Sequence, residues 1–312
     1  MFCLVSVQAS ERAFPELRGS ACAVISAQLA EPLAGTAPRG VAWIAVEDRG
    51  TWASRAVRDS STTWLHELDA RASAVNVGVM LIRRPGRAGR EPVEHRHVVL
   101  ATTLPGRSAA ETLVMDQNED LLDLDVEQLA AGNLPGRGDP VTEPLLLVCT
   151  NGRRDPCCSV AGRALADRLA AIAPHAIWEC SHLGGHRFAP TALMLPSGYA
   201  YGRLTVDVGL ELLRQPMSAP PLVEHCRGRT TWDPQGQAAE LAVRASEPEL
   251  DADAVMVSTL ADDQRQVTVA GAHRHVVTLQ RNPVPEPRSI SCGAEPTTPM
   301  VVRVTEMVTA DV

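Results

Sequence analysis

Two cysteines and two histidines between residues 149 and 186 could together hold a metal ion or a metal-sulfur cluster. Cys149 and Cys158 are separated by eight residues, and His182 and His186 are separated by three. Thiolate and neutral imidazole are ligands for zinc and for iron-sulfur clusters. The sequence therefore predicts a Cys2His2 site, and the residue types alone leave open whether zinc or iron occupies it.

The elements around the cysteines are expected to bring both sulfurs to one place. Residues 145–150 (LLLVCT) form a short continuous apolar run that is typical of a buried strand, with Cys149 at its carboxyl end. Residues 158–173 carry apolar side chains at helical spacing up to Pro174, so Cys158 lies at the amino end of a predicted helix. The loop between them can therefore fold back and place the two thiols side by side.

The surroundings of these residues favour an anionic centre. The positive end of the predicted helix, with Arg153, Arg154 and Arg187 nearby in sequence, is expected to lower the thiol pKa values. Gly184 and Gly185 stand between the two histidines, where the missing side chains permit a sharp turn and the close approach of a cofactor.

Three segments resemble the signature of the sucrase/ferredoxin-like family: CTNGRRDPC followed by Cys158, then SHLGGHRFAP, then YGRL. The resemblance is specific over roughly residues 145 to 207. In that family the C-terminal part is a thioredoxin-like ferredoxin, whose Cys-x8-Cys and His-x3-His pairs carry a [2Fe-2S] cluster. The resemblance implies a soluble electron-transfer protein with one such cluster, held by the following ligands: Cys149, Cys158, His182 and His186.

Cys157 is the alternative to Cys158, because the two are adjacent. The eight-residue spacing favours Cys158, since Arg154 and Asp155 then fall where the family has its Arg-Asp pair. The same vicinal pair could instead serve a thioredoxin-like thiol oxidoreductase, but no Cys-x-x-Cys motif supports that function.

A zinc-stabilised Cys2His2 binding protein is the main alternative function. The long loop between the cysteines differs from the spacing of two to four residues that is usual in zinc fingers, which favours the cluster. With two neutral imidazoles in place of two thiolates, a cluster is less negative and easier to reduce, and we expect electron uptake to be coupled to imidazole protonation. Sucrase activity is not supported, because no acidic motif suggests the carboxylate pair that glycoside hydrolysis needs. An electron-transfer protein is therefore favoured over an enzyme.

Composition narrows the function classes further. The chain has 312 residues, of which 45% are hydrophobic and 3% aromatic, and its net charge is −8. Nucleic-acid binding is not expected, because it needs a basic surface and commonly uses aromatic stacking. All 29 basic residues are arginine, which excludes mechanisms based on a Schiff-base lysine or a P-loop lysine.

The predicted location is the cytoplasm, without membrane association. We find no stretch of about 18 apolar residues and no secretory signal pattern at the N-terminus. The cysteines are too sparse for a disulfide scaffold, so metal binding, redox chemistry or burial is expected of them: Cys3, Cys22, Cys149, Cys157, Cys158, Cys180, Cys226 and Cys292. The expected partners are redox proteins that donate and accept electrons, and the sequence does not identify them.

The order of predicted elements indicates an α/β (α+β) fold in three parts. A strand, a helix, two strands and a helix over 118–132 precede the Pro/Gly-rich stretch at 133–144, which is the predicted linker, and the same order recurs after it. This repeated order is what a duplicated thioredoxin-like architecture would give. The predicted domains are an N-terminal thioredoxin-like half at 1–140, the thioredoxin-like ferredoxin domain at 141–220, and a small α+β domain at 221–312.

Overall fold

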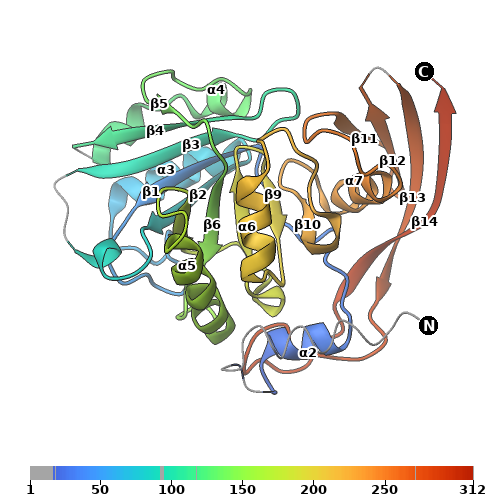
Figure 1. The fold of residues 1–312 in the computed structure, drawn as a ribbon, viewed down its shortest axis with the longest axis horizontal. Helices are drawn as coiled ribbons and strands as arrows, with labels where there is room; N and C mark the ends of the chain where they lie inside the picture. The colour runs from blue at the N-terminus through green and yellow to red at the C-terminus, as the bar shows by residue number, and fades with distance from the viewer. Residues whose placement is uncertain (1–16, 18, 92–94, 117, 271, 312) are drawn as a thin grey trace.

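The computed structural model describes residues 17, 19–91, 95–116, 118–270 and 272–311. Its strands form two sheets (Figure 1). The larger sheet has ten strands in the order β10-β9-β8-β6-β7-β2-β1-β3-β4-β5, and the smaller has four in the order β11-β12-β13-β14. Helices and strands are both well represented, which confirms the predicted α+β class.

The N-terminal half contributes five strands to the large sheet. Strand β1 is buried along its whole length, which explains the continuous apolar run in its sequence. It pairs parallel with β2 and antiparallel with β3. The elements of this half are β1 (Ala42–Glu47), α3 (Thr63–Ala74), β2 (Val77–Arg83), β3 (Arg96–Thr102), β4 (Ala109–Met115), the 3-10 helix η2 (Asn118–Asp123), α4 (Val126–Ala130) and β5 (Asp139–Pro140).

The following half repeats this arrangement. Strand β6 pairs parallel with β7 and antiparallel with β8, as β1 does with β2 and β3. Its elements are β6 (Leu145–Cys149), the π-helix η3 (Cys158–Gly162), α5 (Arg163–Ala170), β7 (Ile177–Cys180), the 3-10 helix η4 (His186–Phe188), β8 (Ala192–Leu195), β9 (Tyr199–Tyr201) and α6 (Val206–Arg214). The equal strand order of the two halves is the repeat that the element order predicted.

The two halves share one sheet and one core. Strands β2 and β7 pair antiparallel, so the sheet runs through the predicted boundary at residue 140 without a break. One face of the strands from both halves forms a single apolar cluster that includes Trp43, Ile82, Cys149 and Trp178. The other face is covered separately, by α3 and α4 in the first half and by α5 and α6 in the second.

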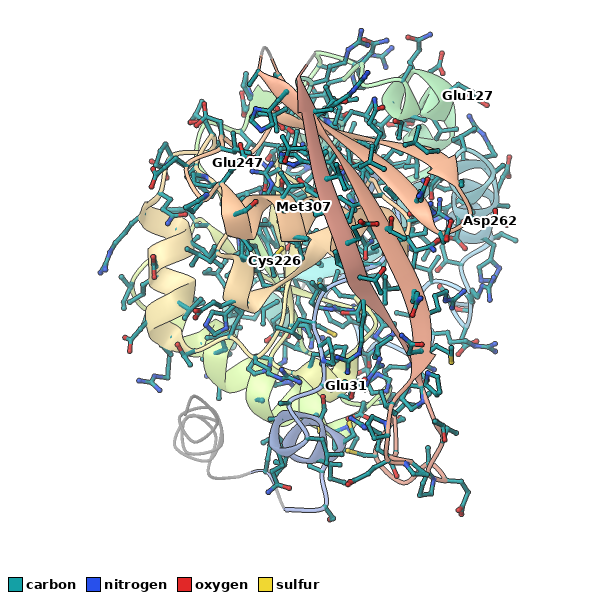
Figure 2. All side chains as sticks on the ribbon, turned by 90° about the vertical axis from the view of Figure 1, so that its right-hand side faces the viewer. Glu31, Glu127, Cys226, Glu247, Asp262 and Met307 are labelled. Atoms are coloured by element: carbon teal, nitrogen blue, oxygen red, sulfur yellow. The ribbon has the colours of Figure 1, made fainter. Side chains whose placement is uncertain are left out.

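The C-terminal part adds the small sheet and one long helix. The helix α7 (Pro234–Ser246) begins with Pro234, and the Asp233 side chain caps it by accepting a hydrogen bond from the Gly236 N–H. Figure 2 shows the four strands of the small sheet, with Met307 on β14, and Glu247 just beyond the end of α7. The remaining elements are α2 (Cys22–Gln28), the 3-10 helices η1 (Ala88–Arg90) and η5 (Val223–His225), and strands β10 (Cys226–Arg229), β11 (Val255–Ala261), β12 (Gln264–Val269), β13 (His273–Pro283) and β14 (Met300–Asp311).

Several sequence-based boundaries are wrong or incomplete. The helix predicted over 118–132 is two short helices, because the Asp125 carboxylate accepts a hydrogen bond from the Gln128 N–H and starts α4 afresh. The stretch at 133–144, predicted as a linker, contains β5, which pairs with β4. The prediction also missed the following helices and strands: α2, β4, β10, β11 and β14.

Cys3 and the N-terminal segment that was tested for a secretory signal lie outside the described residues. Within the described part of the chain, no helix is both long and apolar enough to cross a bilayer.

Candidate metal centre

Cys149 lies at the carboxyl end of β6, as the sequence predicts. It is in register with Cys180, the last residue of the parallel neighbour β7, so the loops that follow both strands leave from one edge of the sheet. Cys149 is buried, and its backbone N–H donates to the Thr191 carbonyl of the segment that leads into β8. The strand pairing therefore fixes Cys149 directly below the loop that carries the two histidines.

Cys158 approaches Cys149 from the start of the following helix. The first turn, Cys158–Gly162, is a π-helix rather than an α-helix, and such turns often occur at functional sites. A side chain at Gly162 would collide with the Cys149 carbonyl, since an added Cβ would lie 2.1 Å from that oxygen. Glycine at this position is what lets the helix start pack directly on the end of β6.

The two histidines lie on either side of a left-handed turn. Gly184 and Gly185 both have φ near +65°, a conformation that glycine adopts without strain. The turn brings the imidazoles of His182 and His186 into a near-parallel stack, with ring centroids 6.1 Å apart. His186 is buried and His182 is half-buried.

The electrostatics of the cysteine pair favour a thiolate. Hydrogen bonds with Cys158 and His182, and a further one from the Leu183 backbone N–H, hold the pKa of Cys149 well below its usual range despite burial. Its negative charge in turn raises the pKa of Cys158, to which it is hydrogen-bonded. The two opposite shifts show that a second negative charge is unfavourable beside the first, and a cation between the sulfurs would favour ionisation of both thiols.

Arg227 on β10 supplies a buried positive charge next to this pair. It is 1% exposed, and burial lowers its pKa to about 10, while the thiolates of Cys149 and Cys158 oppose that shift. Its guanidinium donates to the carbonyls of Thr36 and Gly184, so it also holds the turn between the histidines. No ion pair between Arg227 and a carboxylate is found among the described residues, which leaves the thiolates as its counter-charges.

Asp155, in the loop between the cysteines, faces His186. Its Oδ2 lies 3.8 Å from His186 Nε2, and both side chains are buried. Burial lowers the pKa of His186, and the nearby carboxylate opposes that shift. His186 is therefore kept in the neutral form that binds metals. One of its ring nitrogens faces a carboxylate, an arrangement that is common for metal-bound histidines.

Two other cysteines near this site, Cys157 and Cys180, do not join the pair of Cys149 and Cys158. Cys157 is turned away from Cys149 and lies beside Cys22 and Cys292. Cys180 is fully buried in β7, where burial raises its thiol pKa well above the usual range.

Of the arginines expected to stabilise the centre, Arg154 acts electrostatically on His186. Arg153 and Arg154 are exposed, and Arg187 pairs with Glu31 at 2.8 Å. Arg227 supplies the buried positive charge next to the thiols, and nothing in the sequence of β10 indicated it because it lies 41 residues beyond His186.

The four predicted residues suit a metal-sulfur group by their donor chemistry. His182 Nδ1 and His186 Nδ1 are both buried, and neither has a hydrogen-bond partner. An unpaired buried nitrogen is costly unless another group occupies its lone pair. Two such nitrogens and two buried thiols are the donors that a [2Fe-2S] cluster with mixed ligation would take.

Comparison with known proteins agrees with the signature in the sequence. The family model described as sucrase/ferredoxin-like matches residues 33–228, which include both halves of the large sheet and β10. Searches of curated proteins and of solved structures each found no match. Since the matched region is well over half of the chain and contains the complete Cys-x8-Cys and His-x3-His pattern, this chain belongs to the sucrase/ferredoxin-like family.

Proposed function

We propose that this protein transfers single electrons through one [2Fe-2S] cluster. Its ligands would be Cys149 and Cys158 together with His182 and His186. The observation that carries the proposal is that β6 and β7 place a thiol pair and an imidazole pair at one buried edge, where both Nδ1 atoms lack a partner. Such a cluster supplies one-electron redox chemistry when bound.

The spread of the four ligands favours a binuclear group over a single zinc ion. A tetrahedral zinc with bonds of about 2.0–2.3 Å requires all its ligand atoms to lie within about 3.3–3.8 Å of one another. Two groups among the described residues have three or more potential ligand atoms within 4.8 Å of each other, and neither is this set. They are Cys22, Asp155, Cys157 and Cys292, and Glu247, His273 and His275. In a [2Fe-2S] cluster the four ligands instead bind two irons in pairs.

The protein residues around the site have distinct roles in electron transfer. Burial of Cys149 and Cys158 excludes water from the thiolate side. Arg227 adds a fixed positive charge there, which favours the more negative, reduced state. His182 is half-buried, and an added side chain at Gly184 would meet nothing within 4 Å, so this end of the site is the open one. A redox partner would therefore exchange electrons over the His182 and Gly184 end.

Iron, sulfide and zinc analysis of the purified chain, together with its visible spectrum, tests the proposal. We expect a red-brown protein with two irons and two sulfides per chain. A colourless protein whose only metal is a zinc that is lost in His182→Ala would contradict it and favour the zinc-stabilised alternative.

The turn between the histidines offers a matched pair of variants. Gly184→Ala and Gly185→Ala both place alanine at φ near +65°, at a cost of roughly 1–2 kcal/mol each. At Gly185 the added Cβ would also lie 2.4 Å from the Arg227 guanidinium, whereas at Gly184 it meets nothing within 4 Å. We therefore expect Gly185→Ala to lower the iron content per chain strongly and Gly184→Ala to keep most of it. Equal iron contents in the two variants would show that Arg227 does not hold this turn in place.

The midpoint potential should fall as pH rises. A metal-bound imidazole keeps a second ring nitrogen, whose proton is held more tightly once an electron has been added. The groups that face His186 are Asp155, His182, Arg154 and Cys149. The slope should approach about 59 mV per pH unit where one proton accompanies one electron. Voltammetry of the full chain from about pH 6 to 10 measures it, and a pH-independent potential would contradict imidazole ligation.

The candidate site also suggests which partners the protein has and where in the cell it works. A solvent-facing end with imidazole ligation suits protein donors and acceptors of electrons, and we propose that the protein works with them in the reducing cytoplasm, where its thiols stay free. The seven cysteines that the structure describes are all free thiols. We do not propose sucrase activity for this protein, although the family name contains the word sucrase.

A further inference from the structure

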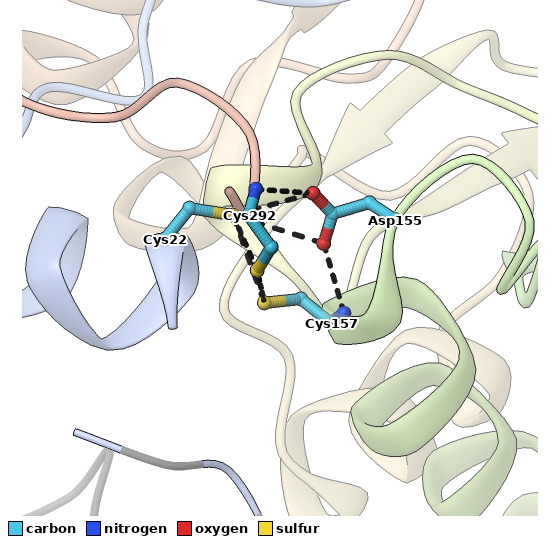
Figure 3. A group of neighbouring side chains, drawn as sticks. All are labelled: Cys22, Asp155, Cys157 and Cys292. Atoms are coloured by element: carbon cyan, nitrogen blue, oxygen red, sulfur yellow. Dashed lines mark hydrogen bonds between the residues drawn. The ribbon is translucent and has the colours of Figure 1, made fainter. Parts of the chain in front are cut away.

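Three cysteines from distant parts of the chain meet on the far side of the loop that carries Cys158. Cys22 begins α2, Cys157 immediately precedes the π-helix, and Cys292 lies between β13 and β14 (Figure 3). The Sγ atoms of Cys22 and Cys157 are 3.6 Å apart, those of Cys157 and Cys292 are 3.3 Å apart, and those of Cys292 and Cys22 are 3.6 Å apart. The sulfurs thus form a nearly equilateral triangle.

The size of this triangle matches a single tetrahedral metal ion. Zinc-sulfur bonds of about 2.3 Å place two thiolates of one tetrahedron about 3.8 Å apart. A disulfide requires about 2.05 Å, and the structure leaves all three thiols free. Cysteines that bind different irons of a cluster have sulfurs farther apart, because the metal atoms lie between them. The triangle is therefore too wide for a disulfide and too narrow for a cluster.

Asp155 supplies an oxygen for the fourth position. Its two carboxylate oxygens lie 3.7 and 3.8 Å from Cys22 Sγ, and it belongs with the three cysteines to one group of ligand atoms within 4.8 Å. The carboxylate is held by the backbone N–H groups of Cys157 and Cys292, at 2.9 and 2.8 Å, and by the Ser291 hydroxyl at 3.0 Å. Such hydrogen bonds fix the orientation of a metal-binding carboxylate.

The three sulfurs and the carboxylate are enclosed together by the protein. Cys22 and Cys157 are 1% and 0% exposed, and Asp155 is 1% exposed. Concentrating three thiols around a buried carboxylate is unfavourable unless a positive ion sits among them. A set of three soft sulfurs and one oxygen with this geometry selects zinc.

We propose that Cys22, Cys157 and Cys292, with Asp155 as the fourth ligand, form a structural zinc site. Cys22 precedes and Cys292 follows the region that the family model matches, residues 33–228. The zinc would fasten both flanking segments onto the loop between Cys149 and Cys158. The two adjacent cysteines would then bind different metals: Cys157 would bind the zinc, and Cys158 would bind the metal of the Cys149 site. The proposal does not depend on which metal the Cys149 site holds.

Zinc analysis of the full chain and of two cysteine variants tests this site. We expect one zinc per chain in the wild type when the Cys149 site holds iron, and two when that site also holds zinc. In Cys292→Ala the zinc content of the proposed site should fall at least about tenfold, because one of the four ligands is lost. Cys226→Ala removes a buried thiol outside both sites and should keep the zinc. Iron and the visible spectrum should persist in Cys292→Ala, which separates this site from the Cys149 site.

Zinc K-edge absorption of the unmutated protein gives a readout that does not depend on the folding of a variant. We expect three sulfurs at about 2.3 Å and one oxygen at about 2.0–2.2 Å. Two sulfurs with two nitrogens, or zinc that is lost in Cys149→Ser and retained in Cys292→Ala, would overturn the proposal. So would a wild-type protein without zinc, or a disulfide between Cys157 and Cys292 found by mass spectrometry.

Discussion

Serine at Cys149 or at Cys158 should abolish the visible absorption of the purified protein and its bound iron. Both thiols are buried at the joined ends of β6 and the π-helix. A serine hydroxyl is too weakly basic to replace a thiolate on iron. Iron content per chain, measured beside the visible spectrum, should fall to background in either variant.

Cys157→Ser is the matched control for this experiment. Cys157 is adjacent to Cys158 and equally buried, but its Sγ contacts Cys22 and Cys292 instead of Cys149. This variant should keep a visible spectrum and bound iron. If Cys157→Ser bleaches the protein while Cys158→Ser retains full iron, the assignment within the vicinal pair is wrong.

The second large effect is expected from Arg227→Met. The substitution removes a buried charge and leaves the Gly184 carbonyl, and that of Thr36, without their donor. Breaking such a buried charged contact typically costs about 3–5 kcal/mol, so the free energy of unfolding should drop by that order. The midpoint potential should also fall, because the positive charge that favours reduction is gone. Denaturant titration and voltammetry measure the two effects.

Two further variants serve as controls for Arg227→Met, one for its effect on stability and one for its effect on the midpoint potential. Arg214→Met removes an exposed arginine at the end of α6 and should change the free energy of unfolding by less than about 0.5 kcal/mol. Arg227→Lys keeps the charge but loses the fork of donors, so its potential should stay closer to that of the wild type than the Met variant does. Equal midpoint potentials in the wild type, Arg227→Met and Arg227→Lys would show that Arg227 has no electrostatic role at the site.

The local parts of the site could be predicted from the sequence because they depend on short-range patterns. The apolar run 145–149 and the helical spacing after Cys158 place the two cysteines at a strand end and a helix start, as observed. The Gly184-Gly185 pair indicated a sharp turn, and both residues adopt positive φ. These features follow from residue type over a few positions, where local conformational preference decides the structure.

The long-range parts could not be predicted in this way. Arg227 reaches the site because β10 pairs with β9 at the edge of the sheet, and a charged residue in a short strand ordinarily indicates exposure. Cys22 and Cys292 are 270 positions apart and meet only after α2 and the segment before β14 have docked. The antiparallel pairing of β2 with β7, which joins the halves, likewise has no local signal.

Pulsed electron paramagnetic resonance of the reduced protein, prepared with nitrogen-15 histidine, tests the central claim most directly. A reduced [2Fe-2S] cluster is paramagnetic, and a histidine nitrogen bound to iron gives a strong hyperfine coupling that thiolate ligands do not give. The account predicts two such couplings, one from His182 and one from His186, with one coupling lost in each single His→Cys variant. A reduced cluster without directly bound nitrogen, or with couplings unchanged in both variants, would contradict it.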